Sequence, residues 1–255
     1  MTTDFPRIPL ARILVADMAA DAPVSPDATR AHWLARVRAW TQALRPLQGR
    51  GVALACEDGF EFAAALFGAW QAGATPWMPA DELPATLQRL QGDGLAFAGD
   101  LPGGVRAADG IASDIALETL DLDACSLVLF TSGSTGEPAA IRKSLRQLDA
   151  EVAALESAFG LLAADALVQG TVSHQHIYGL LFRVLWPLSA RRPFARRRLA
   201  YNEQLTALGP GPIVLVASPA HLKRLPDTQD WRALARGLRV VFSSGGPLPA
   251  DALVQ

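Results

Sequence analysis

Residues 130–143 read FTSGSTGEPAAIRK and continue an apolar stretch, SLVLF at 126–130, that predicts a buried strand. Two glycines, Gly133 and Gly136, permit a sharp turn and a close approach of the backbone to a ligand. Hydroxyl donors lie beside the glycines: Thr131, Ser132, Ser134 and Thr135. Backbone N–H groups in such a loop can surround an anion, and phosphate oxygens suit them. The segment therefore predicts a strand that ends in a phosphate-binding loop.

Other interpretations of this loop were weighed on its residues. A cluster of Gly, Ser and Thr is by itself more often an exposed turn, but the buried strand before it and the helix after it argue against that. The loop contains neither the Walker A pattern nor the dinucleotide-binding glycine pattern. Glu137 does not favour phosphate, so we expect it either to hold a divalent metal ion or to remain in solvent.

The sequence after the loop predicts an amphipathic helix and then further strands and helices. Apolar residues recur at spacings of three and four, which places them on one helix face: Leu145, Leu148, Val152, Leu155 and Phe159. Strands are then predicted at 166–172, 213–218 and 239–244, with helices near 177–189 and 219–225. This alternation predicts an α/β fold with parallel-rich sheets flanked by helices.

The sequence before the loop repeats the same alternation. A helix is predicted over Thr29–Leu44 with Asp27 as its cap, and a heavily buried helix over 59–72. Strands are predicted in order at 51–56, 75–78 and 95–98, with a helix between the last two, and residues 99–123 are expected to be a surface connection. We therefore expect two α/β subdomains, 1–120 and 121–255, the second carrying the phosphate-binding loop.

The loop resembles the signature loop of the adenylate-forming superfamily, which includes acyl-CoA and aryl-CoA synthetases and peptide-synthetase adenylation domains. Residues Thr131 to Pro138 fit that pattern, but Ala139 stands where the family usually has lysine. The resemblance implies that the loop holds the β- and γ-phosphates of ATP, and that Lys143 or Arg142 compensates for the missing lysine. The phosphate-binding residues implied are Thr131, Ser132, Gly133, Ser134, Thr135, Gly136, Glu137 and Lys143.

Two further segments support the resemblance and follow in the family's order. SHQHIYGLLF at 173–182 is similar to the segment in which H-x-x-G begins a helix beside the acyl pocket. It implies a pocket role for His176, with Tyr178 also lining the pocket. VFSSGGPLP at 241–249 is similar to a strand and glycine turn whose backbone meets adenine. The adenine-binding residues implied are Ser244, Gly245 and Gly246.

The resemblance implies an AMP-forming acid–thiol ligase that uses ATP and Mg²⁺. The acid becomes an acyl-adenylate and is transferred to coenzyme A or to an acyl carrier protein. The pattern GEP-x-x-I-R-K-S-L is similar to ligases that load aromatic acids, such as hydroxybenzoates, in aryl-polyene pigment biosynthesis. The family's C-terminal catalytic domain is not expected within these 255 residues, so we expect this chain to be an N-terminal fragment that is inactive alone.

One alternative from another functional class is open. The chain can be a non-catalytic, adenylation-like module that binds a partner or carrier protein, which Ala139 favours. A kinase-type phosphate-binding fold is disfavoured because the Walker lysine is absent.

Composition excludes several other functions. The net charge is −2, and 50% of the residues are hydrophobic, so we expect neither a nucleic-acid partner nor a membrane surface. No secretory signal or membrane span is evident, and a cytoplasmic location is expected. Cys56 and Cys125 are expected to be buried thiols, and the six tryptophans to pack in or beside the core.

Histidine and arginine clusters were considered as further sites. The pair His174 and His176 lacks a third metal ligand nearby, so no metal site is expected there, and His174 is expected to be structural or exposed. A group of arginines is interpreted as a solvated basic edge, with the phosphates of coenzyme A or an acidic carrier protein as the alternative. Its members are Arg191, Arg192, Arg196, Arg197 and Arg198.

Overall fold

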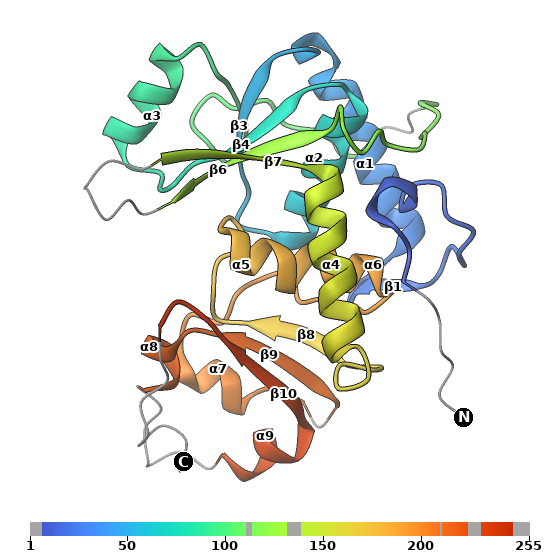
Figure 1. The fold of residues 1–255 in the computed structure, drawn as a ribbon, viewed down its shortest axis with the longest axis vertical. Coiled ribbons are helices and arrows are strands. Elements are labelled where there is room, and N and C mark those ends of the chain that lie inside the picture. The colour runs from blue at the N-terminus through green and yellow to red at the C-terminus, as the bar shows by residue number, and fades with distance from the viewer. Residues whose placement is uncertain (1–6, 111–113, 132–138, 210, 224–230, 247–255) are drawn as a thin grey trace.

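The fold is described from a computed structural model and is shown in Figure 1. The description covers residues 7–110, 114–131, 139–209, 211–223 and 231–246. The strands are β1 (Pro23–Ser25), β2 (Ala28–Thr29), β3 (Gly51–Ala55), β4 (Thr75–Met78), β5 (Ala96–Gly99), β6 (Ser126–Thr131), β7 (Ala139–Ser144), β8 (Leu167–Gly170), β9 (Ile213–Ala217) and β10 (Leu238–Ser243).

The longer helices and the short helical turns alternate with these strands. The α-helices are α1 (Arg30–Leu44), α2 (Gly59–Gln71), α3 (Pro84–Gly92), α4 (Leu145–Phe159), α5 (Ile177–Leu180), α6 (Trp186–Ser189), α7 (Asn202–Thr206), α8 (Pro219–Leu222) and α9 (Arg232–Gly237). The other helical turns are η1 (Leu10–Arg12), η2 (Arg45–Leu47) and the π-helical turn η3 (Leu181–Leu185).

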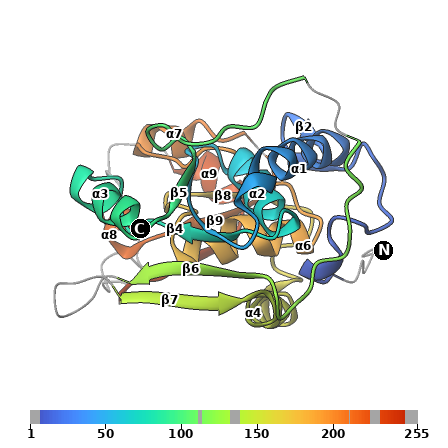
Figure 2. The same cartoon turned by 90° about the horizontal axis from the view of Figure 1, so that it is seen from above.

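The first sheet has five strands in the order β5-β3-β4-β6-β7. β5, β3, β4 and β6 are parallel, whereas β7 pairs antiparallel to β6 and forms the edge. Figure 2 shows the β6–β7 hairpin along one side of the molecule. β7 was not predicted, because its sequence AAIRKS lacks an apolar alternation and most of it is exposed. Its pairing with β6 across the loop is what makes it a strand.

The second sheet has three parallel strands in the order β10-β9-β8. Together the two sheets confirm the predicted α/β class with parallel-rich sheets flanked by helices. The five-stranded sheet takes β6 and β7 from beyond residue 120, so the division between the sheets does not coincide with the predicted subdomain boundary. The division into two subdomains stays a prediction.

Helices α1 and α2 form the main core beside the first sheet. α2 is buried along almost its whole length, as predicted, and its Asp58 cap accepts hydrogen bonds from the backbone N–H groups of Phe60 and Glu61. Each large apolar side chain buried there contributes about 1.5–3 kcal/mol. The cap of α1 is Thr29, whose side chain accepts from the His32 N–H. The prediction of Asp27 as the cap was wrong.

Other contacts of Asp27 explain why Thr29 caps α1 in its place. Asp27 lies in the turn between β1 and β2, where its carboxylate accepts a hydrogen bond from Ser25 and pairs with Arg196 at 3.1 Å. Ser25 and then Arg196 hold the pKa of Asp27 below its usual value. The next residue with a capping side chain, Thr29, therefore takes the helix end.

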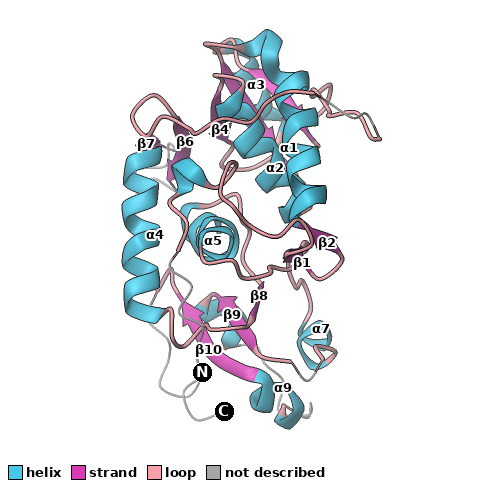
Figure 3. Ribbon diagram, turned by 90° about the vertical axis from the view of Figure 1, so that its right-hand side faces the viewer, coloured by secondary structure: helices cyan, strands magenta, loops and turns pink. Residues whose placement is uncertain are grey.

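Helix α4 runs from the first sheet to the second, as Figures 1 and 3 show. It begins at a capping box formed by Ser144 and Gln147. The predicted apolar face is confirmed: Leu145, Leu148 and Val152 are buried, and the last two members, Leu155 and Phe159, pack half-buried against the core.

The remaining predictions about single residues have mixed outcomes. Trp33, Trp40, Trp70 and Trp186 are buried, and Trp77 and Trp231 are half-buried. Both cysteines are free thiols, but only Cys56 is buried and Cys125 is half-buried. Within the part of the chain that the structure describes, no helix is long and apolar enough to cross a membrane.

Candidate functional site

The carboxyl ends of several parallel strands meet on one side of the molecule. In Figure 1, β6 and the strands of the second sheet run towards the same side, and α5 lies between the two sheets. A cleft of about 420 Å³ opens there, lined by the segments that follow β3, β4 and β8 and by Arg198. Its lining residues are Glu57, Pro79, Ala80, Asp81, Glu82, Ser173, His174, Gln175, His176 and Arg198. Ligand sites of parallel α/β sheets lie at such carboxyl ends.

His176, the predicted pocket residue, lines this cleft. It is exposed and occupies the N-cap position of α5, with φ −110° and ψ 153°. No side-chain capping hydrogen bond holds its imidazole at the helix end. The ring is therefore available to contact a ligand in the cleft.

The H-x-x-G spacing has a steric cause at Gly179. A β-carbon at Gly179 would lie 1.9 Å from the backbone oxygen of Ser173, well inside contact distance. Only glycine lets the first turn of α5 pack this closely on residues 173–174. This close packing fixes the backbone just before His176 and so fixes where the imidazole lies.

His174 is a structural residue, which is one of the two outcomes expected from the sequence. It is 4% exposed, and its Nε2 lies 2.8 Å from the Cys56 carbonyl oxygen. Because a carbonyl only accepts, Nε2 carries the proton. Burial, followed by repulsion from the positive charge of Arg183, lowers the pKa of His174 to about 4. His174 is therefore neutral near pH 7 and joins the β8–α5 segment to the end of β3.

Arg183 is a residue that the sequence analysis missed. It is 2% exposed within η3, and its Nη1 donates to the Val172 carbonyl oxygen at 2.5 Å. Burial, followed by repulsion from Arg198, lowers the pKa of Arg183 to about 10. A single arginine in the apolar stretch LLFRVLW was the only available signal. Its contact supports the backbone that leads from β8 to His176.

For the predicted phosphate-binding loop, the structure describes only the strands before and after it. Ser132, Gly133, Ser134, Thr135, Gly136 and Glu137 lie outside the described residues, as does Pro138. Thr131 is described only as the last residue of β6, paired with Ala139 at the start of β7. A strand does precede the loop, as predicted, and the antiparallel β7 follows it.

Lys143 lies on β7, away from Ala139, the position at which the family usually has lysine. In the β7 register Lys143 lies opposite Leu127, about 13 Å along the strand from Ala139 at 3.3 Å per residue. Its Nζ pairs with the Glu151 carboxylate at 2.5 Å. The neighbouring Arg142 donates to Ser126 Oγ at 2.7 Å. Neither cation is directed to the position of the family lysine.

The predicted adenine-binding turn follows β10 at the same side of the second sheet. Ser244, Gly245 and Gly246 are exposed, and Gly245 has φ +98°, a conformation that only glycine adopts readily. Among the described residues, no atom lies within 4 Å of a β-carbon placed at either glycine. The backbone of this turn is therefore open to a flat ligand.

Tyr178 belongs to an aromatic cluster and does not line the cleft. Its ring centroid lies 4.8 Å from that of Phe182, which in turn lies 4.9 Å from Phe242 of β10. The Tyr178 hydroxyl is buried and has no hydrogen-bond partner among the described residues. Burial raises the pKa of this phenol. The cluster joins α5 to β10, between the His176 cleft and the glycine turn.

The arginine group is not a uniform solvated edge, so that interpretation was wrong for two of its members. Arg192 is 8% exposed and pairs with Glu156 at 2.6 Å, and Arg196 pairs with Asp58 at 2.7 Å. Arg197 and Arg198 are exposed. Only Arg198 of this group lines the cleft.

Metal ligands were sought over the same residues. Across the described ranges, no group of three or more His, Cys, Asp or Glu side chains is arranged to hold a metal ion. The acidic side chains of the cleft, Glu57, Asp81 and Glu82, therefore do not form such a group.

One family model matches most of this chain. The profile of the family described as AMP-binding enzyme matches residues 78–255. The curated proteins contain no match. Among solved structures, ATP-bound MatB from Rhodopseudomonas palustris is similar, with a TM-score of 0.74 and 18% identity over 96% of this chain and 56% of that chain.

Two further structures are similar to the same degree. MenE from Bacillus subtilis, an o-succinylbenzoate CoA synthetase in complex with its acyl-adenylate intermediate, has a TM-score of 0.75 and 16% identity over 97% of this chain and 55% of that chain. A malonyl-CoA ligase with methylmalonyl-CoA and AMP bound has a TM-score of 0.73 and 21% identity over 96% and 57%. The chain thus spans a little over half the length of these structures, and at these identities the likeness shows the fold.

Proposed function

The chain belongs to the AMP-binding enzyme family, and from that premise we propose that it activates a carboxylic acid with ATP as an acyl-adenylate. The observation that carries the proposal is the cleft at the carboxyl ends of β3, β4 and β8, which holds His176. In such a site an acid and a nucleotide are brought together, and catalysis comes mainly from positioning and from stabilisation of charge.

Each part of the site has one task in this proposal. His176 borders the acid in the cleft, and the turn at Ser244, Gly245 and Gly246 takes the adenine. The loop of residues 131–138 between β6 and β7 holds the pyrophosphate portion of ATP. The carboxylate attacks the α-phosphorus of ATP, a P–O bond forms to the acyl oxygen, and pyrophosphate leaves.

The proposal that the protein uses Mg²⁺ rests only on the sequence of the predicted phosphate-binding loop. No described residues form a ligand group for it, and Glu137, the one candidate raised by the sequence, lies outside the described residues. No step is therefore assigned to the metal ion here.

The acyl acceptor is proposed to be a thiol, that of coenzyme A or of an acyl carrier protein. The bound methylmalonyl-CoA of the similar malonyl-CoA ligase supports coenzyme A. The aromatic acid is proposed from the loop's own sequence, and the o-succinylbenzoate of MenE supports a ring-bearing substrate. A hydroxybenzoate is the first acid to test.

A second candidate function is a non-catalytic adenylation-like binding module. The ion pair between Lys143 and Glu151 favours this second candidate. With Lys143 paired in this way, no described lysine takes the place of the lysine that the family usually has at the position of Ala139. Such a module would keep the cleft and its contacts to an acid or a carrier protein without turning over ATP.

The experiment is acid-dependent incorporation of labelled pyrophosphate into ATP. It is run with the 255-residue chain and with the product of the complete reading frame, against hydroxybenzoates and fatty acids. We expect exchange by the complete product with one class of acid, and little by the 255-residue chain alone. A folded complete product that exchanges with no acid, yet binds one, would contradict the proposal and establish the second candidate.

A further inference from the structure

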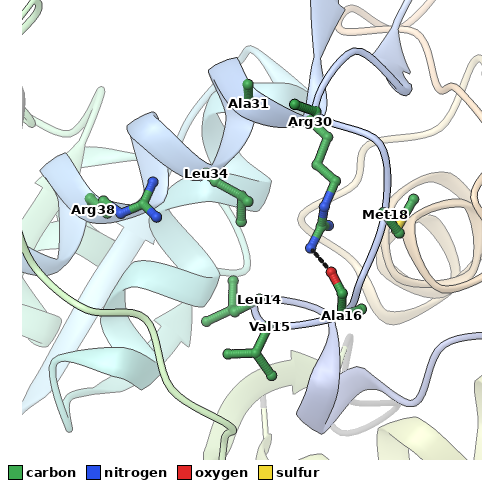
Figure 4. Close-up of a pocket in the computed structure, with 9 residues that line it drawn as sticks. Leu14, Val15, Ala16, Met18, Arg30, Ala31, Leu34 and Arg38 are labelled. Carbon is green, nitrogen blue, oxygen red and sulfur yellow. Dashed lines mark hydrogen bonds between the residues drawn. The ribbon is translucent and has the colours of Figure 1, made fainter.

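A second cavity lies on the opposite part of the chain, between α1 and the N-terminal segment. It measures about 340 Å³, within the lower range of small-molecule sites. It is lined by Leu14, Val15, Ala16, Met18, Ala20, Arg30, Ala31, Leu34 and Arg38. None of these residues lines the His176 cleft. Figure 4 shows Leu34 of α1 pointing towards the segment that carries Leu14 and Val15.

The only charged groups in this lining are two arginines from one face of α1. Arg30, Leu34 and Arg38 recur at intervals of four residues, so all three lie along the same side of the helix. At 1.5 Å per residue the two arginines are about 12 Å apart along the axis. The remaining walls are aliphatic, so the cavity combines positive charge with apolar surface.

Arg30 is a buried cation without a carboxylate. It is 4% exposed, and both of its hydrogen bonds use Nη2, which donates to the Ile13 and Ala16 carbonyl oxygens at 3.0 Å. No ion pair of Arg30 occurs among the described residues. A guanidinium buried in this way is costly unless an anion compensates it.

The surroundings of Arg30 add to the positive potential. Burial, followed by repulsion from the nearby Arg191, lowers the pKa of Arg30. Arg30 is also the first residue of the 15-residue helix α1, where the partial charge of the helix is positive. The nearest acidic residues of the segment, Asp17 and Asp21, are exposed and do not line the cavity.

We propose that this cavity binds a small organic carboxylate with an apolar body. The carboxylate meets the N–H groups of Arg30 Nη1 and Nε, because both hydrogens of Nη2 already donate to the Ile13 and Ala16 carbonyl oxygens. The aliphatic body lies against Leu14, Met18 and Leu34, and Arg38 marks the outer end of the cavity. A monoanion fits better than a phosphate ester, because a dianion loses more hydration on entering apolar walls. This site is separate from the proposed acid-activation site.

The test measures ligand affinity by isothermal titration calorimetry on the 255-residue chain. Octanoate is the probe, and 1-octanol is the uncharged control ligand of matched length. Arg30 itself is left intact, since its contacts to Ile13 and Ala16 also hold the segment. Ala31→Phe fills the cavity from an exposed position of α1. Ala35→Phe makes the same change at an exposed position that does not line it.

We expect octanoate to bind the unchanged chain at least about tenfold more tightly than 1-octanol, and Ala31→Phe to weaken octanoate about tenfold. Ala35→Phe and His176→Ala should leave the affinity for octanoate unchanged. Equal affinities in Ala31→Phe and Ala35→Phe, equal binding of the acid and the alcohol, or loss of binding in His176→Ala would each overturn the proposal. So would the absence of octanoate binding up to about 10 mM.

Discussion

The β8–α5 junction and the β6–β7 hairpin carry the two most informative sequence motifs, yet they are built differently. The junction is anchored from several directions: His174 to the Cys56 carbonyl, Arg183 to the Val172 carbonyl, and Gly179 against Ser173. The hairpin ends in an exposed edge strand, β7. The more recognisable motif is thus followed by an exposed edge strand.

This difference has a chemical consequence. A group that orients an acid needs a fixed position, and buried contacts at the junction supply it for His176. The side chains of β7 instead contact their own hairpin or α4, as in Arg142 with Ser126 and Lys143 with Glu151. We therefore expect substitutions at the junction to cost more than substitutions on β7.

The largest effect is expected from Gly179→Ala. The new methyl group would lie 1.9 Å from the Ser173 oxygen, so the backbone of the junction must move. The free energy of unfolding should fall by about 3 kcal/mol or more, as measured by urea unfolding. Gly92→Ala in α3 is the matched control, because its methyl group would meet nothing within 4 Å. Equal stability of the two variants would show that the junction is not tightly packed.

A pH-dependent effect is expected from His174. Its pKa is about 4 in the folded protein and 6.5 in the unfolded chain, so the unfolded state binds the extra proton between these values. Stability is therefore complete above pH 6.5 and falls by about 2 to 3 kcal/mol as the pH drops to 4.

The measurement is urea unfolding of His174→Gln from pH 4 to pH 7. Glutamine retains an N–H donor for the Cys56 carbonyl but does not titrate in this range, so the variant should lose this part of the pH dependence. His176→Gln, at an exposed position, should retain it. An unchanged pH dependence in His174→Gln would rule out the buried neutral imidazole.

The smallest effect is expected on the hairpin, from Lys143→Met. The Lys143–Glu151 pair is partly exposed, so its loss should cost no more than about 1 kcal/mol. The affinity for an ATP analogue, measured by calorimetry, should not change, because Lys143 lies far along β7 from the loop. Arg146→Met, which breaks the exposed pair with Asp123, serves as the control. A tenfold loss of nucleotide affinity in Lys143→Met alone would place this lysine at the phosphates.

Much of this architecture could be predicted from local patterns. Apolar runs marked β3, β6 and β9, and the spacing of Leu145, Leu148 and Val152 marked α4, because burial on one face leaves a periodic trace in the sequence. The H-x-x-G pattern predicted a pocket role for His176, and His176 lines the cleft, but that role stays a prediction.

What could not be predicted depends on contacts between distant residues. β7 is a strand because it pairs with β6, and Asp27, which does not cap α1, forms an ion pair with Arg196 far along the chain. The roles of Arg183 and of the Cys56 carbonyl exist only once β3, β8 and α5 are packed together. None of these contacts leaves a local pattern.

The most direct test compares the KM for the acid with the KM for ATP in the pyrophosphate-exchange assay. The assay uses the product of the complete reading frame. His176→Ala removes the imidazole that lines the cleft without touching the contacts of the junction. We predict that the KM for the acid rises about tenfold while the KM for ATP stays within about twofold. A rise in the KM for ATP with an unchanged KM for the acid would contradict the assignment of the cleft to the acid.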